Sequence, residues 1–204
     1  MGLELLNIQA EVAGGESFEV LEGMKSNMTE VNFVLDTLLH WGKKHIKGVY
    51  LDASKFIINS RIQDTIDQLA MSMRMKNVNA HNLIPPNTSV YTDPDQFSFV
   101  IRNLMSNAVK YSFDGGDIEI GLLSTSRQDQ VIVYVKDRGV GISEADRSTI
   151  FTPLSKSQVG TVNELGNSLA LVVSKEFMAF NGGEIWFDDN EDGPGTTFFV
   201  QFPI

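Results

Sequence analysis

Three polar side chains recur on one predicted helix, which begins after Asp93. Asn103, Asn107 and Lys110 stand at positions i, i+4 and i+7, so they share one face of that helix. Amide oxygens are hard ligands for Mg²⁺, and an ammonium group offsets phosphate charge. The stripe therefore suits a metal–polyphosphate site, with Tyr111 beside it as a candidate to lie against a base. A solvated helix face is the competing interpretation.

A second candidate follows a predicted strand, in the run Asp137-Arg138-Gly139-Val140-Gly141. The Asp137 carboxylate can accept a hydrogen bond from an exocyclic amino group such as that of adenine. Gly139 and Gly141 would let the backbone approach a flat base closely. The same residues also describe an ordinary glycine turn after a strand, so this run alone is not specific.

A third candidate is a glycine-bearing loop that contains Gly160 and Gly166 and leads into a predicted helix at Ser168 and Leu169. The first N–H groups of a helix are free to bind phosphate, and the helix dipole favours negative charge there. The alternative is that Ser168 simply caps the helix.

The chain opens with a helical pattern that predicts a short helix at 1–12, a break at 13–15 and a long helix at 17–47. The short helix cannot cover the long one, so we expect the apolar stripe of the long helix to form a homodimer with a second copy. An ordinary core face is the alternative. The stripe comprises Leu21, Met24, Met28, Val31, Leu35 and Leu38.

The rest of the chain predicts an α+β fold: an α/β sandwich of a mixed, mainly antiparallel sheet covered by helices, preceded by the N-terminal helical hairpin. The expected domains are 1–48 and 49–204. Residues 143–166 have weak periodicity and predict a long loop, which is usually functional or mobile. Helices are expected around 62–73, 94–111 and 169–180, and strands at 49–56, 89–92, 117–123, 131–136, 184–187 and 196–202.

The composition of the 204 residues excludes several classes of function. The absence of cysteine excludes a disulfide scaffold, a thiolate zinc site and a cysteine nucleophile, and only three histidines argue against a histidine metal centre. A formal charge of -10 argues against nucleic acid or anionic lipid as the main partner. With no apolar run of about 18 residues and no basic signal-peptide region, we expect no membrane contact by this chain itself.

Taken in order, the three candidates resemble the catalytic ATP-binding domain of two-component sensor histidine kinases, in the superfamily shared with gyrase and heat-shock ATPases. The resemblance extends from Ser54 to the C-terminus, and the long N-terminal helix resembles the second helix of the family's dimerisation hairpin. Residues 103–112 match the N box, 137–142 the G1 box, 150–153 the F box, 166–173 the G2 box, and 195–203 the last strand.

The resemblance implies ATP and Mg²⁺ as cofactors. The need for ATP implies a cytoplasmic location, either as a cytoplasmic protein or as the cytoplasmic part of a membrane-anchored sensor. The resemblance also implies transfer of the γ-phosphate to a histidine, and then to an aspartate on a response regulator receiver domain. Asn103 would be catalytic and polarise the γ-phosphate region, Asn107 would bind Mg²⁺, and Lys110 would contact phosphate. Tyr111 would pack near the adenine.

By the same resemblance, Asp137 would accept from the adenine amino group, and Gly139 and Gly141 would shape the pocket. Residues 143–166 would form the ATP lid. The remaining nucleotide-binding residues would be Gly166, Ser168, Leu169 and Thr196.

Two departures from the family pattern matter. The phosphoacceptor H box is missing, because His40 precedes Trp41, His45 precedes Ile46 and His81 lies beyond the hairpin. We therefore expect surface or packing histidines and no autophosphorylation of this chain. Ser168 replaces the second glycine of the G2 box and is expected to weaken ATP binding about fivefold to tenfold. The alternative function is a nucleotide-binding-impaired pseudokinase that acts as a dimeric docking module.

Overall fold

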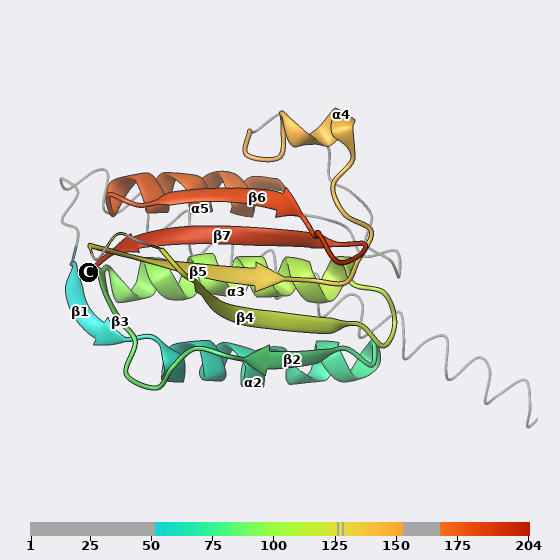
Figure 1. The fold of residues 1–204 in the computed structure, drawn as a ribbon, viewed down its shortest axis with the longest axis horizontal. Helices are drawn as coiled ribbons and strands as arrows, with labels where there is room; N and C mark the ends of the chain where they lie inside the picture. The colour runs from blue at the N-terminus through green and yellow to red at the C-terminus, as the bar shows by residue number, and fades with distance from the viewer. Residues whose placement is uncertain (1–51, 126, 128, 153–167) are drawn as a thin grey trace, which may run out of the picture. The chain divides into compact units, whose positions relative to one another are not determined.

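A five-stranded sheet is the central element of the part that the computed structural model describes, residues 52–125, 127, 129–152 and 168–204 (Figure 1). The strand order is β2-β4-β5-β7-β6. β2 runs parallel to β4, and the other neighbours are antiparallel. The strands are β2 (Asn79–Asn82), β4 (Asp117–Leu123), β5 (Gln130–Lys136), β6 (Glu184–Asp189) and β7 (Thr196–Pro203).

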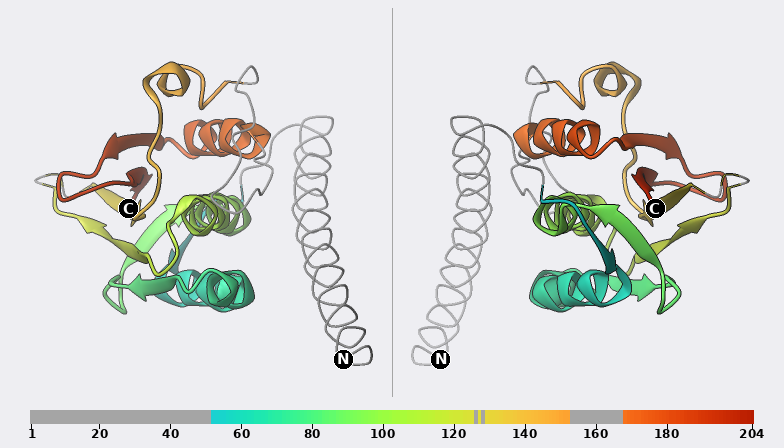
Figure 2. Two further views of the ribbon diagram at one scale, coloured as in Figure 1. Left: turned by 90° about the vertical axis from the view of Figure 1, so that its right-hand side faces the viewer. Right: turned by 90° about the vertical axis from the view of Figure 1, so that its left-hand side faces the viewer.

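Three helices, α2 (Asn59–Met75), α3 (Pro94–Tyr111) and α5 (Ser168–Phe180), lie on one side of this sheet (Figure 2). A short helix, α4 (Glu144–Arg147), follows β5, and β1 (Ser54–Ile57) pairs antiparallel with β3 (Ser89–Thr92) in a small second sheet. The predicted α+β class with a mixed, mainly antiparallel sheet is confirmed. None of the helices in these ranges combines the length and apolar character that crossing a bilayer requires.

The core forms where alternate strand residues meet the apolar face of α3. Phe97 of α3 packs against Phe202 of β7, with ring centroids 5.1 Å apart. The apolar face of α3 is buried from Phe97 to Ala108, and Tyr111 at the end of the helix is partly exposed. Buried residues that share this core include Val100, Leu104, Ile118, Ile120, Val133, Val135, Val200 and Phe202.

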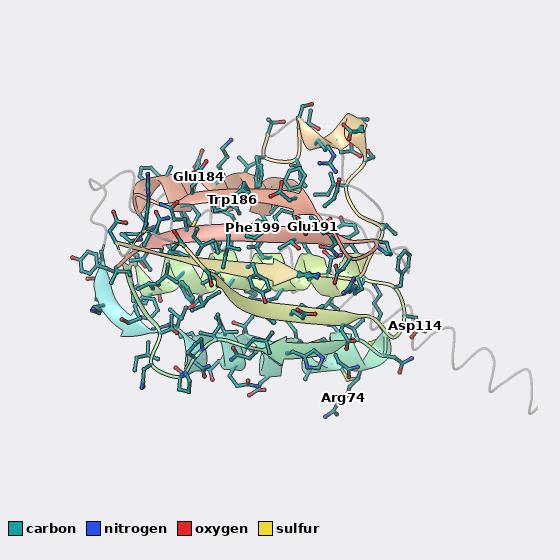
Figure 3. The ribbon with its side chains drawn as sticks, viewed as in Figure 1. Arg74, Asp114, Glu184, Trp186, Glu191 and Phe199 are labelled. Carbon is teal, nitrogen blue, oxygen red and sulfur yellow. The ribbon has the colours of Figure 1, made fainter. Side chains whose placement is uncertain are left out.

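The opposite face of the sheet carries an aromatic pair. Trp186 of β6 and Phe199 of β7 are register partners whose rings stack at 5.2 Å, on the face turned away from α2, α3 and α5 (Figure 3). Tyr134 of β5 is the next residue in the same row, opposite Phe199. These pairs fix the register of the strands that lead to the candidate site.

Both ends of α3 are held by side chains. At the start, the Asp93 carboxylate accepts hydrogen bonds from the backbone N–H groups of Asp95 and Gln96, at 3.0 and 3.2 Å. At the end, the buried ammonium of Lys76 donates to the carbonyls of Val109, at 2.9 Å, and Lys110. A carboxylate at the start and a cation at the end of a helix both stabilise it. The helix that carries the asparagine stripe is therefore fixed at each end.

The structure differs from the sequence-based prediction in two places. β2 was not predicted, because it is only four residues long and its sequence, Asn-Ala-His-Asn, is mostly polar with no β-branched or large apolar residue that would indicate a buried strand. The predicted loop 143–166 contains the single-turn helix α4 in its described part. His81 is a surface residue, as expected, and its ring lies 3.1 Å from Asp117. The predicted helices at 1–12 and 17–47 lie outside the described residues.

Candidate functional site

The first residue of the asparagine stripe on α3, Asn103, faces α5 rather than bulk solvent. Asn103 is only 6 % exposed, and its amide donates to the hydroxyl of Ser174 on α5 at 2.9 Å. The Nδ2 atom of Asn107, one turn later, lies 3.5 Å from Oδ1 of Asn103. A fully solvated helix face is therefore wrong for Asn103, while the partly exposed Asn107 remains accessible to a ligand.

A cation and an aromatic ring stand together in the last turn of α3. Lys110 is buried, and its ammonium nitrogen lies 5.5 Å from the centroid of the Tyr111 ring. The Tyr111 side chain is partly exposed. Asn107, Lys110 and Tyr111 thus bring an amide oxygen, a positive charge and a flat ring to one end of the helix.

The carboxylate of Asp137 is held directly after β5. It is only 5 % exposed, and its Oδ1 atom accepts a hydrogen bond from the Thr196 backbone N–H at 3.2 Å. Burial raises the pKa of Asp137 to about 6, although backbone hydrogen bonds from Thr196 and Gly139 oppose this rise. A desolvated carboxylate in a fixed position favours a ligand that can donate a hydrogen bond to it.

Two glycines shape this segment, and the first of them lets it approach α3. A Cβ atom on Gly139 would lie 2.1 Å from the Tyr111 carbonyl oxygen, which no real side chain tolerates. The Val140 N–H donates to that same carbonyl at 3.2 Å. Gly141 has a φ of +71°, in the left-handed region that favours glycine. The end of α3 and the Asp137 segment therefore meet, as the two separate sequence candidates required.

The predicted site residues are distributed as follows. Asn103, Asn107, Lys110 and Tyr111 lie along α3, and Tyr111 contacts the Gly139 segment. Asp137 is bound to Thr196, the first residue of β7. Ser168 is the first residue of α5, and Leu169, which follows it, is partly buried. Gly166 lies outside the described residues, as do residues 153–165 of the predicted lid.

The described start of the predicted lid is attached to β6. Arg147 of α4 forms an ion pair with Asp189. The Phe151 ring lies 6.1 Å from Phe187 and 6.5 Å from Phe198, centroid to centroid. This part of the 143–166 segment is thus packed against the sheet rather than free.

Two functional candidates escaped sequence analysis. Ser174 is a single polar residue on the buried face of α5, between Leu171 and Met178, and that irregularity was a usable signal. Asn190 donates from Nδ2 to the Asp137 carbonyl at 2.7 Å. No signal in the sequence distinguished Asn190 from its acidic neighbours.

The donor set fits a magnesium nucleotide. Because Nδ2 of Asn107 faces Asn103, its Oδ1 atom is the one that can bind a cation. The described ranges contain no cluster of three or more histidine, cysteine, aspartate or glutamate side chains that could hold a metal ion by themselves. A cation at Asn107 would therefore take most of its ligands from phosphate and water, which is the usual habit of Mg²⁺.

Comparisons with known proteins agree with this chemistry. Residues 92–204 match the family model described as histidine kinase-, DNA gyrase B- and HSP90-like ATPase. The chain is 31 % identical over 139 residues to sensor histidine kinase WalK of Bacillus subtilis (strain 168), covering 68 % of this chain and 23 % of WalK. It is 31 % identical over 144 residues to sporulation kinase E of the same organism, covering 70 % and 19 %. The chain thus spans about a fifth of the length of these relatives.

Two solved structures share the fold. The catalytic domain of histidine kinase ThkA superposes with a TM-score of 0.62 at 23 % identity, covering 74 % of this chain and 95 % of that one. Histidine kinase AdeS of Acinetobacter baumannii gives 0.65 at 20 % identity, covering 87 % of this chain and 80 % of that one.

Proposed function

Because the chain belongs to the histidine kinase-, DNA gyrase B- and HSP90-like ATPase family, we propose that it is the ATP-binding core of a two-component sensor histidine kinase. It transfers the γ-phosphate of ATP to a histidine, for relay to an aspartate of a response regulator. The observation that carries this proposal is the buried Asp137 carboxylate. It is bound to Thr196, next to the point where the segment with Gly139 meets the end of α3. The kinase relatives favour this function over the docking module.

The adenine end of the site is proposed to lie at Asp137. Its carboxylate accepts a hydrogen bond from the exocyclic amino group of the base. Gly139 lets this segment pack against the end of α3, and Gly141, where a Cβ would meet only the Gly195 carbonyl oxygen at 3.8 Å, leaves room for a flat ring. Thr196 fixes the carboxylate from the neighbouring strand. Tyr111 covers the base from the end of α3.

The phosphate end is proposed to lie along α3 and at the start of α5. Asn107 binds Mg²⁺ through its amide oxygen, Lys110 offsets phosphate charge, and Asn103 polarises the γ-phosphate region. When bound, Mg²⁺ supplies charge neutralisation at the phosphate oxygens. The N-terminus of α5, at Ser168 and Leu169 after Gly166, offers backbone N–H groups to phosphate. Catalysis is then mainly positioning and electrostatic stabilisation.

We further propose a homodimer through the apolar stripe of residues 17–47 and a response regulator receiver domain as the downstream partner. The regular 3-4 spacing of the stripe supports the first proposal. The names of the kinase relatives support the second. A reaction that consumes ATP supports a cytoplasmic location.

A phosphoryl-transfer assay tests the kinase proposal. The chain is incubated with γ-labelled ATP and Mg²⁺, alone and with a separately produced helical hairpin that bears a phosphoacceptor histidine. We expect acid-labile, base-stable label on the hairpin and none on the chain itself. ATP binding without label on either component contradicts the kinase assignment and leaves nucleotide binding intact.

A further inference from the structure

The end of β6 and the turn that leads to β7 are strongly acidic, with the sequence Asp188-Asp189-Asn190-Glu191-Asp192, and we call this segment the acidic turn. Figure 3 labels Glu191 in this turn. Two of its carboxylates are neutralised by cations of the same chain. Asp192 pairs with Lys136 at 2.8 Å and with Arg138 at 2.5 Å, and these partners hold the pKa of its carboxyl at about 2. Asp189 pairs with Arg147. The acidic turn thus binds internal cations.

The two cations bound by Asp192 are the residues on either side of Asp137. Lys136 ends β5, and Arg138 also donates to the Asp192 carbonyl, at 3.2 Å. The turn also approaches Asp137 itself, because a Cβ atom on Gly195 would lie 2.2 Å from the Asp137 carbonyl oxygen. Three successive residues around the proposed adenine contact are therefore held by one turn.

Asn190 makes the direct link. Its Nδ2 atom donates to the Asp137 carbonyl at 2.7 Å and to the Pro194 carbonyl at 3.2 Å. Its Oδ1 atom accepts from the Thr197 hydroxyl at 2.7 Å. The amide has one orientation only, since a flipped amide would place its oxygen against two carbonyl oxygens. Asn190 therefore holds the backbone carbonyl of Asp137, while Thr196 holds the Asp137 backbone N–H, at 2.9 Å, and its side chain.

We propose that Asn190 is a positioning residue that sets the preference of the site for adenine over guanine by holding Asp137 in place. This inference rests on the proposed nucleotide function. Adenine presents an amino group where guanine presents a carbonyl oxygen. A fixed carboxylate accepts from the first and repels the second. If the backbone of Asp137 can shift, the carboxylate loses part of its favourable contact with adenine. The same shift relieves part of its repulsion of guanine.

The test is titration of the chain with Mg-ATP and with Mg-GTP, for the wild type and for Asn190→Ala. We expect the wild type to prefer ATP. In Asn190→Ala we expect the affinity for ATP to fall about threefold to tenfold, while the affinity for GTP changes less. The ATP-to-GTP affinity ratio therefore falls by nearly the same factor as the affinity for ATP. Glu191→Gln, which changes an exposed neighbour in the same turn, is the matched control and keeps the wild-type ratio.

A second variant covers the case in which Asn190→Ala does not fold. Thr197→Val removes the hydroxyl that orients the Asn190 amide, and we expect it to narrow the preference by a smaller factor. A purely structural role would lower the melting temperature and leave the ATP-to-GTP ratio unchanged, and that result overturns the inference. If the wild type binds ATP and both variants keep its ATP-to-GTP affinity ratio, only the inference about Asn190 is refuted. A folded wild type that binds neither nucleotide refutes the proposed function as well.

Discussion

The side-chain amide of Asn103 donates a hydrogen bond to the hydroxyl of Ser174, 2.9 Å away, and so ties α3 to α5. The two residues are 71 positions apart in the sequence, and both are buried. Ser174 in turn donates to the Ala170 carbonyl at 2.8 Å. The proposed catalytic asparagine is thereby linked to the helix whose first residues are proposed to bind phosphate.

The variant Ser174→Ala tests this link. It leaves a buried amide of Asn103 without its acceptor, so we expect the free energy of unfolding to fall by about 1–3 kcal/mol. Because Asn103 is proposed to act at the γ-phosphate, phosphoryl transfer should fall more than ATP affinity. Urea unfolding, calorimetric titration and the transfer assay measure the three effects.

A matched control is available on α2. The buried hydroxyl of Thr65 donates to the Arg61 carbonyl at 2.9 Å, the same local arrangement as Ser174 and Ala170. Thr65→Val should change stability and leave nucleotide binding and transfer at wild-type levels. Full transfer activity in Ser174→Ala would show that the link has no part in the reaction.

The affinity for ATP should depend on the ionisation of Asp137. Burial raises the pKa of this carboxyl to about 6, so it loses its charge as the pH falls through that value. Since the charged form is the better acceptor, ATP affinity should fall roughly fourfold between pH 7.5 and 5.5. Titrations at several pH values measure it, with Mg²⁺ in excess so that ATP stays in its Mg-bound form. An ATP affinity that stays constant between pH 7.5 and 5.5 would rule out this role for Asp137.

The same carboxylate should lower the stability of the nucleotide-free chain at neutral pH. The pKa in the folded state lies above the ordinary value of 3.8, so the folded chain binds more protons than the unfolded chain between these pH values. Stability therefore falls as the pH rises from about 4 to about 6. Asp137→Asn should raise the free energy of unfolding at pH 7 by about 1–3 kcal/mol and remove this dependence. A variant less stable than the wild type at pH 7 would contradict this.

Gly139 should be intolerant of any side chain. In Gly139→Ala the new Cβ meets the Tyr111 carbonyl oxygen, so the Asp137 segment must move away from α3. We expect loss of detectable ATP binding and a lower melting temperature. Gly115→Ala is the comparison, because its Cβ meets nothing within 4 Å and costs only about 1 kcal/mol for its φ of +74°. Wild-type affinity in Gly139→Ala would contradict the proposed contact between the two elements.

Much of the fold was predictable because its signals are local. Asp93 followed by proline marked the start of α3, and short runs of apolar, largely β-branched residues marked β4 and β5. β2 was missed because its pairing with β4 comes from contacts distant in the sequence. Residues 1–51 and 153–167 lie outside the described ranges, so the dimer hairpin and the role of Gly166 stay predictions, as does the effect of Ser168.

The residues proposed to contact the nucleotide could be predicted from their types and spacing. The residues that hold them in place could not. Asn103, Asn107 and Asp137 were identified because their chemistry and spacing suit a magnesium nucleotide. Asn190 was not, since its partner Asp137 is 53 residues away and only the folded chain brings them together. An asparagine within an acidic turn looks like an ordinary surface residue until its three partners, Asp137, Pro194 and Thr197, are known.

Calorimetric titration of Mg-ATP into the chain, with Asp137→Asn as the control, tests the central claim of ATP binding most directly. We predict one site with a dissociation constant in the micromolar to sub-millimolar range, and loss of that binding in Asp137→Asn, which keeps its fold. The absence of heat at millimolar ATP from a folded wild-type chain would contradict the account, and so would equal binding by Asp137→Asn.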